Sequence, residues 1–184
     1  MRIEKVQVED AAKLLEIYGY YVANTAISFE YEIPTLEEFQ NRIKTISEKY
    51  PYIMAVDEDG TILGYAYATA FKGRRAYDWS VESTIYIRKE SRRLGLGRIL
   101  YTTLEQQLTD MGILNMNACI ALPKGEDPHL TDDSIRFHKN LGFIEVGVFH
   151  DSGFKFNTWY DMIWMEKMLG SHSDEPQPVS FGMF

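Results

Sequence analysis

The stretch of sequence that decides the fold is 81–111, which reads VESTIYI (81–87), RKESRRLGLG (88–97) and RILYTTLEQQLTDM (98–111). Side chains in its first part alternate between two faces with a period of two residues, which is typical of a strand. Its last part places Leu100, Leu104 and Leu108 at helical spacing, and Gly112 can end the helix in the left-handed conformation. The stretch therefore predicts a strand, a glycine-containing turn and a helix.

The turn between this strand and helix has the features of a phosphate-binding loop. Gly95 and Gly97 remove side chains where the helix begins, so free backbone N–H groups and the positive helix end are open to an anion. Neither the G-x-x-x-x-G-K-[ST] loop of nucleoside-triphosphate-binding proteins nor the G-x-G-x-x-G fingerprint of dinucleotide-binding proteins fits. An ordinary strand–helix turn, with glycines that serve tight packing, fits the same residues.

Length, composition and charge bound the class of protein. The 184 residues are most simply one domain, which we expect to cover 1–170, because 171–184 loses periodicity and predicts a poorly ordered tail. A single cysteine rules out an intramolecular disulfide and favours a reducing compartment. No signal peptide or membrane-length apolar run is evident, so we expect a cytoplasmic protein without membrane association. The formal net charge of −8 argues against non-specific nucleic-acid binding, although a local basic patch is compatible with it.

Periodicity, capping residues and turn signals predict the other elements. Thr35 and Glu38 form a capping box before a helix, and Asp59-Gly60 marks a hairpin turn. We expect strands at 2–8, 52–56, 62–71, 116–122, 143–149 and 158–167, and helices at 9–22, 36–47 and 134–140, with Ala12, Leu15, Tyr18 or Gly19, and Val22 on the buried face of the first helix. The strand–helix–strand unit 81–122 requires a parallel crossover, whereas hairpin-joined strands pair antiparallel, so the sequence predicts a mixed α/β fold.

The spacing Arg92-x-x-Gly95-x-Gly97, after a strand and at the start of a helix, resembles the pyrophosphate-binding motif of the GNAT N-acetyltransferases, which bind acetyl-CoA. The order of the predicted elements resembles the GNAT fold along the whole chain. The resemblance implies an α/β acyl-CoA N-acyltransferase fold, with a mixed, mostly antiparallel sheet, a splayed central parallel strand pair and flanking helices. It also implies acetyl-CoA as cosubstrate and a homodimer.

In the GNAT superfamily the acetyl-pantetheine arm lies in the gap between the splayed strands, and the pyrophosphate lies at the glycine turn. Carried over to this chain, the resemblance implies that the cofactor-binding residues are Ile85, Tyr86, Ile87, Arg92, Arg93, Leu94, Gly95, Leu96, Gly97, Arg98 and Ser134.

Further matches resemble the phosphinothricin N-acetyltransferase branch, which acetylates the α-amino group of phosphinothricin or methionine sulfoximine. The matching segments follow one another over about 130 residues and are Ser28-Phe29-Glu30, 72–86, 92–97, Ser134 with His138 and Leu141-Gly142, and Gly153-Phe154-Lys155 with Trp159 and Asp161. Several matches in chain order carry more weight than one short motif.

Glu82 is the candidate general base. Acetyl transfer needs a neutral amine, and an α-ammonium group is mostly protonated at neutral pH, so a base must lie near the acceptor. Glu82 sits on the central strand, faces away from Val81 and Ser83, and matches the catalytic carboxylate that the resemblance implies. The alternative is a solvated strand residue or an ion pair with Arg74.

His138 is the second catalytic candidate. Many acetyltransferases carry a tyrosine at this place as donor to the leaving sulfur, whereas the phosphinothricin branch carries histidine. A histidine there is suited to protonate sulfur or to take the amine proton. The alternative is a structural histidine, hydrogen bonded to a carbonyl on a half-buried helix. The three other histidines lack metal-ligand spacing, so we expect no metal, and Cys119 reads as a buried structural thiol.

The acceptor candidates are Arg74, Tyr77 and Phe29. An arginine fork binds carboxylate or phosphinate oxygens bidentately, and Arg74 and Tyr77 precede the central strand. Phe29 would form a wall from the early loop, and the alternative for the arginine-rich segment is a solubilising charged loop. The loop 124–133 is longer and more acidic than in the phosphinothricin branch, which puts the herbicide-type acceptor in doubt but not the reaction.

The sequence thus predicts an acetyl-CoA-dependent N-acetyltransferase that acts on the α-amine of a small amino acid or toxic analogue by direct transfer in a ternary complex. One alternative is acetylation of a protein or peptide amine, which needs an open groove. The other is a noncatalytic acetyl-CoA-binding module, which would have no use for both Glu82 and His138.

Overall fold

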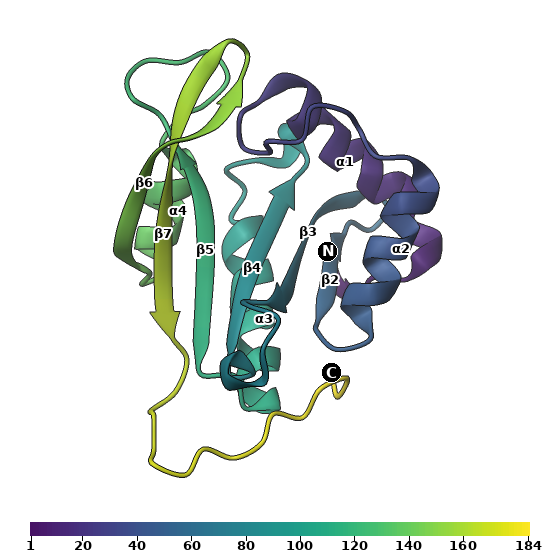
Figure 1. The fold of residues 1–184 in the computed structure, drawn as a ribbon. Helices are drawn as coiled ribbons and strands as arrows, with labels where there is room; N and C mark the ends of the chain where they lie inside the picture. Colours follow the sequence, from purple (N-terminus) through teal and green to yellow (C-terminus); the bar gives the residue numbers. More distant parts are fainter.

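One mixed β-sheet runs through the molecule in the computed structural model, which describes residues 1–184 (Figure 1). Its strands lie in the order β1-β2-β3-β4-β5-β7-β6, and every neighbouring pair is antiparallel except β4 and β5. The strands are β1 (Arg2–Lys5), β2 (Tyr52–Val56), β3 (Ile62–Ala70), β4 (Ser80–Ile87), β5 (Asn115–Leu122), β6 (Ile144–Lys155) and β7 (Thr158–Met168). The predicted fold with one central parallel pair is confirmed.

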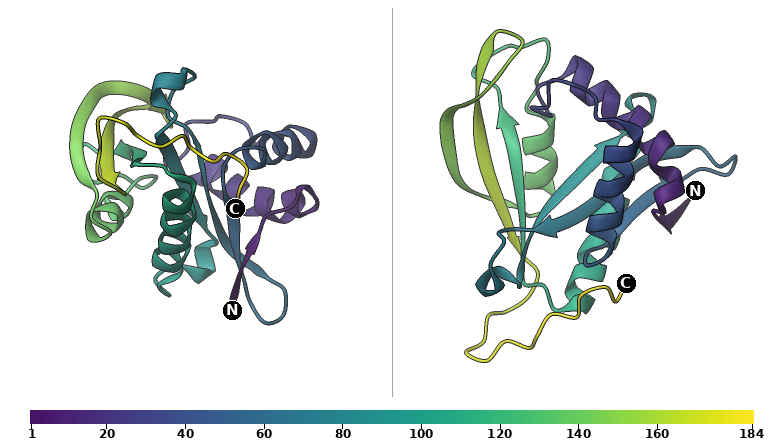
Figure 2. Two further views of the ribbon diagram at one scale, coloured as in Figure 1. Left: turned by 90° about the horizontal axis from the view of Figure 1, so that it is seen from below. Right: turned by 45° about the vertical axis from the view of Figure 1, so that its right-hand side comes forward.

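Helices cover both faces of this sheet (Figures 1 and 2). The helices are α1 (Ala11–Asn24), α2 (Leu36–Ser47), α3 (Leu96–Met111) and α4 (Asp133–Asn140), and three short 3₁₀ turns are η1 (Val8–Asp10), η2 (Arg75–Tyr77) and η3 (Lys89–Ser91). Alternating residues of β2 show the two layers. Tyr52, Met54 and Val56 pack with α1 and α2, whereas Ile53 and Ala55 pack with α3. None of the helices combines the length and the apolar character that crossing a membrane requires.

The buried face of α1 is displaced by one residue from part of the predicted one. Ala11 and Leu14 are fully buried, whereas Ala12 is exposed and Leu15 is only half-buried, so the prediction for these two residues was wrong. The predicted residues that are buried are Tyr18, Gly19 and Val22. Aromatic packing selects this register, because the rings of Tyr18 and Tyr21 both pack edge-on against Tyr86 of β4.

The central parallel pair is short and then opens into a fork. β4 and β5 pair only over 80–82 and 115–117. Where the backbone pairing ends, side-chain hydrogen bonds connect the two strands. Ser83 Oγ donates to the Asn117 carbonyl at 3.0 Å, and Asn117 Nδ2 donates to the Val81 carbonyl at 3.0 Å. β5 continues along β7 instead. The gap therefore widens toward the carboxyl ends of β4 and β5.

The C-terminal hairpin is longer than predicted. β6 does not end at Phe149 but continues through an irregularity, between Phe149 and Gly153, to Lys155. The sequence signal was missed because alternation breaks at this bulge. After β7, the segment 171–184 has no regular element and passes the C-terminal end of α3, where the Ser180 N–H donates to the Met111 carbonyl at 2.9 Å. The low order expected for this tail stays a prediction.

Candidate active site

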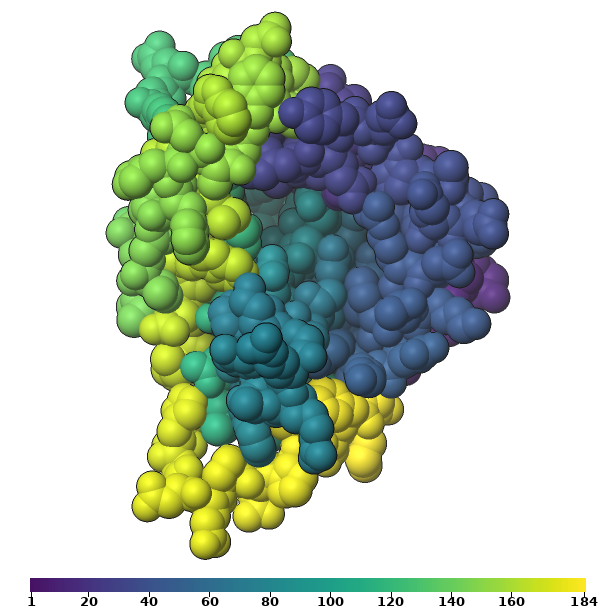
Figure 3. Space-filling model, in the orientation of Figure 1, coloured from purple at the N-terminus to yellow at the C-terminus, as the bar shows by residue number.

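A cavity of about 420 Å³ lies in the fork between β4 and β5. Five consecutive residues of β4, from Glu82 to Tyr86, line it. Successive side chains of a strand point to opposite faces of the sheet. A single cavity can therefore contact all five residues only because it extends through the open fork from one face of the sheet to the other. Figure 3 shows the mouth as a hollow between the segment that follows α1, the C-terminal strands and the segment around η2.

A second cavity, of about 860 Å³, lies at the start of α3 and beside α4. Ile27, Ile85 and Ser134 line both cavities, so the two adjoin. Basic side chains that line the second cavity are Lys89, Arg92, Arg93, Arg98 and Arg136. This local concentration of positive charge stands out in a chain with a net charge of −8 and suits an anionic ligand.

The two glycines of the turn have different tasks. Gly95 precedes α3 with φ of 79°, in the left-handed region that favours glycine, and a Cβ there would meet no atom. At Gly97 a Cβ would lie 2.8 Å from the ring of Phe137, so this position is small for the packing of α3 against α4. The N–H groups of Leu96 and Gly97 stand in the first turn, where a helix offers no carbonyl partner. The tight-packing interpretation therefore applies to Gly97, while phosphate binding at this turn stays a prediction.

Glu82 is half-buried in the wall of the first cavity. Burial raises the pKa of its carboxyl above the usual range, and the positive charge of Lys72 partly offsets this shift. No ion pair joins Glu82 to Arg74, which removes that alternative. A carboxyl with a raised pKa at a cavity wall is a better proton acceptor than an exposed carboxylate.

His138 is buried, lines the same cavity and belongs to a chain of hydrogen bonds. Its Nδ1 donates to the Ser134 carbonyl at 2.7 Å, which leaves Nε2 as an acceptor for the Tyr101 hydroxyl at 3.0 Å. The Tyr101 hydroxyl also lies 3.2 Å from Ser83 Oγ. Burial lowers the pKa of His138 to about 4, so the ring is neutral at pH 7. The carbonyl bond fits the structural alternative, while the position in the cavity wall fits the catalytic one.

Comparison with known proteins decides the family. The acetyltransferase (GNAT) domain family matches residues 3–164. The chain belongs to the GNAT acetyltransferase family. It is 33% identical over 162 residues to phosphinothricin N-acetyltransferase from Streptomyces viridochromogenes, which covers 88% of this chain and 84% of that protein. It is 29% identical over 175 residues to an L-methionine sulfoximine/L-methionine sulfone acetyltransferase from Pseudomonas aeruginosa, with 95% and 98% covered.

A solved structure agrees. A GNAT superfamily phosphinothricin acetyltransferase from Sinorhizobium meliloti, in complex with AcCoA, has a TM-score of 0.86 and 32% identity, and the match covers 100% of this chain and 98% of that one. The protein is therefore an acyltransferase of the GNAT type, and the fold predicted from its sequence is the fold of these relatives.

Most of the predicted cofactor residues of this acetyltransferase meet in one place. Ile85, Ile87 and Ser134 line the second cavity with the residues of the turn, which are Arg92, Arg93, Gly95, Leu96, Gly97 and Arg98. Tyr86 lines the first cavity instead, and the side chain of Leu94 is exposed and lines neither. Their roles in binding stay predictions.

The predicted acceptor residues do not all come together. Phe29 lines the first cavity, as expected for a wall. Arg74 and Tyr77 lie at η2, beside the mouth, and line neither cavity; the Tyr77 ring packs edge-on against Phe71. In the arginine-rich segment before β4, Lys72 is the basic residue whose positive charge lowers the pKa of Glu82.

Sequence reasoning missed Tyr101 and Ser83 as members of the site. Tyr101 follows Leu100 on the buried side of α3, where an aromatic residue is usually part of the core. Only the packing of α3 on β4 brings its hydroxyl to Ser83 and His138. Cys119 lines the cavity as well, and burial and the charge of Glu82 raise the pKa of its thiol to about 12, which fits the predicted non-nucleophilic role.

Proposed function

We propose that this protein transfers acetyl from acetyl-CoA to the α-amino group of a small amino acid or toxic analogue of the phosphinothricin or methionine sulfoximine type. The observation that carries the proposal is the forked cavity, which Glu82, Tyr101 and His138 all line and which adjoins the arginine-lined cavity. The relatives that act on phosphinothricin and on methionine sulfoximine support the acceptor class.

The second cavity fits the cosubstrate. The pyrophosphate would lie at the first turn of α3, against the N–H groups of Leu96 and Gly97 and the side chains of Arg92 and Arg98. The pantetheine arm would follow the edge of β4 that β5 leaves open. There the backbone of Ile85 has no β5 partner.

The Ile87 backbone at this edge is already bonded within the chain. Its N–H donates to the Tyr21 hydroxyl at 3.2 Å, and its carbonyl accepts from the same hydroxyl at 2.6 Å. Ile85 is therefore the better candidate for a backbone bond to pantetheine, and Ile87 would contribute mainly through its side chain.

Glu82 is the better base of the two candidates in a direct transfer. It faces the cavity as a carboxyl with a raised pKa, whereas the Nε2 atom of His138 is occupied by Tyr101 and the ring has a pKa of about 4. After Glu82 takes one proton from the ammonium group, the neutral amine attacks the thioester carbonyl. The tetrahedral intermediate then collapses as the C–S bond breaks, and the remaining extra proton of the nitrogen passes to the departing thiolate of CoA, directly or through water. The Tyr101 hydroxyl, which burial keeps protonated, can turn from His138 to donate a hydrogen bond to that sulfur.

Thiol release from acetyl-CoA tests the proposal. The acceptor panel contains phosphinothricin, methionine sulfoximine, methionine sulfone, the common amino acids and peptides with free N-termini. We expect turnover on one or more of the amino acids and analogues. Turnover on peptides alone would favour the protein-acetylating alternative, and tight acetyl-CoA binding without turnover on any amine would favour a binding module.

The proposal includes a homodimer and a cytoplasmic location. The edge strand β6 carries apolar side chains that are exposed in the single chain, among them Ile144, Val146 and Phe149, and a second copy would cover them. Cys119 is a free thiol, which suits a reducing compartment.

A further inference from the structure

Three segments that are far apart in the sequence interlock beside the first cavity. They are 25–31 after α1, 123–132 before α4, and 150–158 at the tip of the β6–β7 hairpin, which meet at the top of Figure 1. The Ala26 N–H donates to the His129 carbonyl at 3.0 Å, and the His129 ring stacks on Phe156 with centroids 3.8 Å apart. The segment 25–31 supplies Ile27, Ser28 and Phe29 to the wall of the cavity.

Lys155 lies at the centre of this interlock. The residue is only 4% exposed, and its ammonium group donates to the carbonyls of Val22 at 2.7 Å, Thr25 at 2.9 Å and Ser28 at 2.6 Å. An ammonium group has three donors, so all three are used on backbone oxygens, and no carboxylate pairs with it.

The three carbonyls belong to one continuous segment, 22–28, which begins in α1 and leaves it. Val22 is in the last turn of α1, where helical carbonyls have no N–H partner and carry the negative end of the helix dipole. Thr25 and Ser28 belong to the segment that leaves the helix. Without the ammonium group these oxygens would be buried and unpaired, so the segment would have to move to reach water.

Gly153 supports the same wall from the side. A Cβ at this position would lie 2.4 Å from the ring of Phe29, so only glycine leaves room for the ring where it stands. Gly153 and Lys155 are the buried residues of β6, and the other residues of this strand are exposed. The strand thus turns this short part of itself toward the cavity wall.

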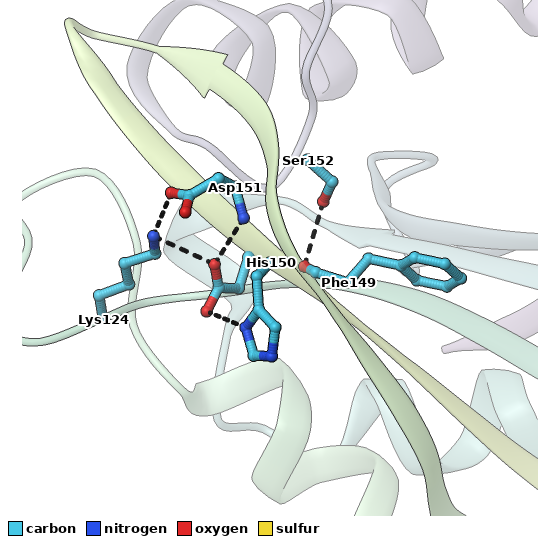
Figure 4. Close-up of polar contacts among 6 residues, drawn as sticks. Lys124, Phe149, His150, Asp151 and Ser152 are labelled. Atoms are coloured by element: carbon cyan, nitrogen blue, oxygen red, sulfur yellow. Dashed lines mark hydrogen bonds and ion pairs between the residues drawn. The ribbon is translucent and has the colours of Figure 1, made fainter.

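The β-bulge between Phe149 and Gly153 reorients β6 so that Gly153 and Lys155 face the cavity wall. The carboxylate of Asp161 on β7 is the centre of a polar cluster at this bulge (Figure 4). Its Oδ1 accepts from the Asp151 N–H at 2.9 Å and pairs with Lys124 Nζ at 3.2 Å, and its Oδ2 lies 3.3 Å from His150 Nδ1. Asp151 itself has φ of 50°, a left-handed conformation that the bulge requires. The Asp151 N–H, then His150 and Lys124, hold the pKa of Asp161 below its usual range, so the carboxylate stays ionised.

We infer that Lys155 is a positioning residue. Its ammonium group fixes 25–29 in place as the preformed acceptor wall of the cavity, while Gly153 and Asp161 shape the part of the β6–β7 hairpin that carries Lys155. The inference rests on the proposed function for the statement that the wall contacts the acceptor. The holding of the segment itself is independent of any substrate.

Amide hydrogen exchange of the substrate-free protein tests the holding of the segment. In Lys155→Met we expect amides of 22–30 to exchange at least tenfold faster than in the wild type. Lys167→Met is the matched control, because Lys167 of β7 is a lysine paired with Glu105 on α3, away from this wall. Lys155→Arg keeps the charge and several donors and should recover most of the protection. Unchanged exchange of 22–30 in Lys155→Met would overturn the inference.

Steady-state kinetics with methionine sulfoximine test the consequence for the acceptor. We expect Lys155→Met to raise the acceptor KM at least tenfold while the affinity for acetyl-CoA changes less than twofold, and Lys167→Met to change neither. A fall in kcat with an unchanged acceptor KM would contradict a role in the wall. If the wild type acetylates no amine, the proposed function fails by that result alone, and hydrogen exchange still decides whether Lys155 holds the segment.

A second variant covers the case in which Lys155→Met does not fold. Gly153→Ala leaves the ammonium group in place but pushes on the ring of Phe29. We expect the same increase in the acceptor KM with acetyl-CoA affinity retained. An unchanged acceptor KM in a folded Gly153→Ala variant would show that the wall does not contact the acceptor.

Discussion

At the scale of single residues, Glu82 should set the pH dependence of the reaction. A general base works in its ionised form, and burial raises its pKa, so the rate should fall as the pH drops through that raised value. We expect Glu82→Gln to lower kcat about 100-fold at pH 7 and to remove this limb of the pH–rate profile. Acetyl-CoA binding should be intact, and the exposed Glu37→Gln should behave as the wild type. A profile that keeps its shape in Glu82→Gln would remove this residue as the base.

His138 should make the folded protein sensitive to acid. In the unfolded chain His138 has the ordinary histidine pKa of about 6.5, whereas burial lowers the pKa of the folded ring to about 4. The contribution of this residue to the free energy of unfolding is therefore fully present above pH 6.5 and is lost as the pH falls to about 4, by a total of about 3 kcal/mol.

Denaturant unfolding at several pH values measures this effect. His138→Gln should flatten the dependence of the free energy of unfolding on pH between 6.5 and 4, while His172→Gln, in the exposed tail, serves as the control. An equal slope in wild type and His138→Gln would show that the buried ring does not resist protonation.

Part of this site was predictable from residue chemistry together with resemblance to a known family. Glu82, His138 and Phe29 could be singled out because their neighbours along the chain resemble a known branch of the family, and all three line the cavity. Tyr101 and Lys155 could not be assigned a task. Their hydrogen-bond partners are distant in the chain, Ser83 and His138 for Tyr101 and Val22, Thr25 and Ser28 for Lys155, so the order of residues does not bring them together.

At the scale of elements, the two glycines of the turn into α3 meet different structural demands. Gly95 is needed for its left-handed backbone, and Gly97 is needed for the space next to Phe137. We expect Gly97→Ala to lower both the melting temperature and the affinity for acetyl-CoA, because α4 must move away from the cavity that the two helices share. Gly95→Ala should cost about 1 kcal/mol of stability through its backbone conformation alone.

A double-mutant cycle separates the two demands. Phe137→Leu removes the ring atoms that an alanine at position 97 would meet, so Gly97→Ala should be less destabilising in that background, whereas Gly95→Ala should cost the same in both. Calorimetry and acetyl-CoA titration give the two readouts. Equal costs of Gly97→Ala in both backgrounds would contradict the packing explanation.

Element order was predictable, but the points where elements change partners were not. A strand–helix–strand unit requires a parallel pair, and the capping box of Thr35 and Glu38 is formed as predicted. The end of the pairing at Glu82 depends on Asn117 and Ser83, whose side chains bond across the fork. The continuation of β6 past Phe149 depends on Asp161, a residue of the next strand.

At the scale of the whole molecule, the sheet has one edge at β1 and the other at β6, and the two edges differ. β1 is four residues long and carries charged side chains, whereas β6 is twelve residues long and exposes Ile144 at 62% and Val146 at 58%. A long apolar edge strand invites pairing with another chain, and a second copy that meets it across a two-fold axis closes the assembly. This asymmetry is the reason to place the proposed dimer interface at β6.

Light scattering coupled to size-exclusion chromatography tests this placement over a range of protein concentrations. We expect the wild type to have the mass of a dimer, and Ile144→Asp with Val146→Asp to shift it toward the monomer, with a dissociation constant at least tenfold higher. Leu36→Asp is the matched control, because Leu36 is an exposed apolar residue in the first turn of α2, where an acidic side chain is tolerated. The cavity walls identified above come from one chain, so a monomeric variant should bind acetyl-CoA as the wild type does. A monomeric wild type, or a dimer unaffected by the two charges, would move the interface away from β6.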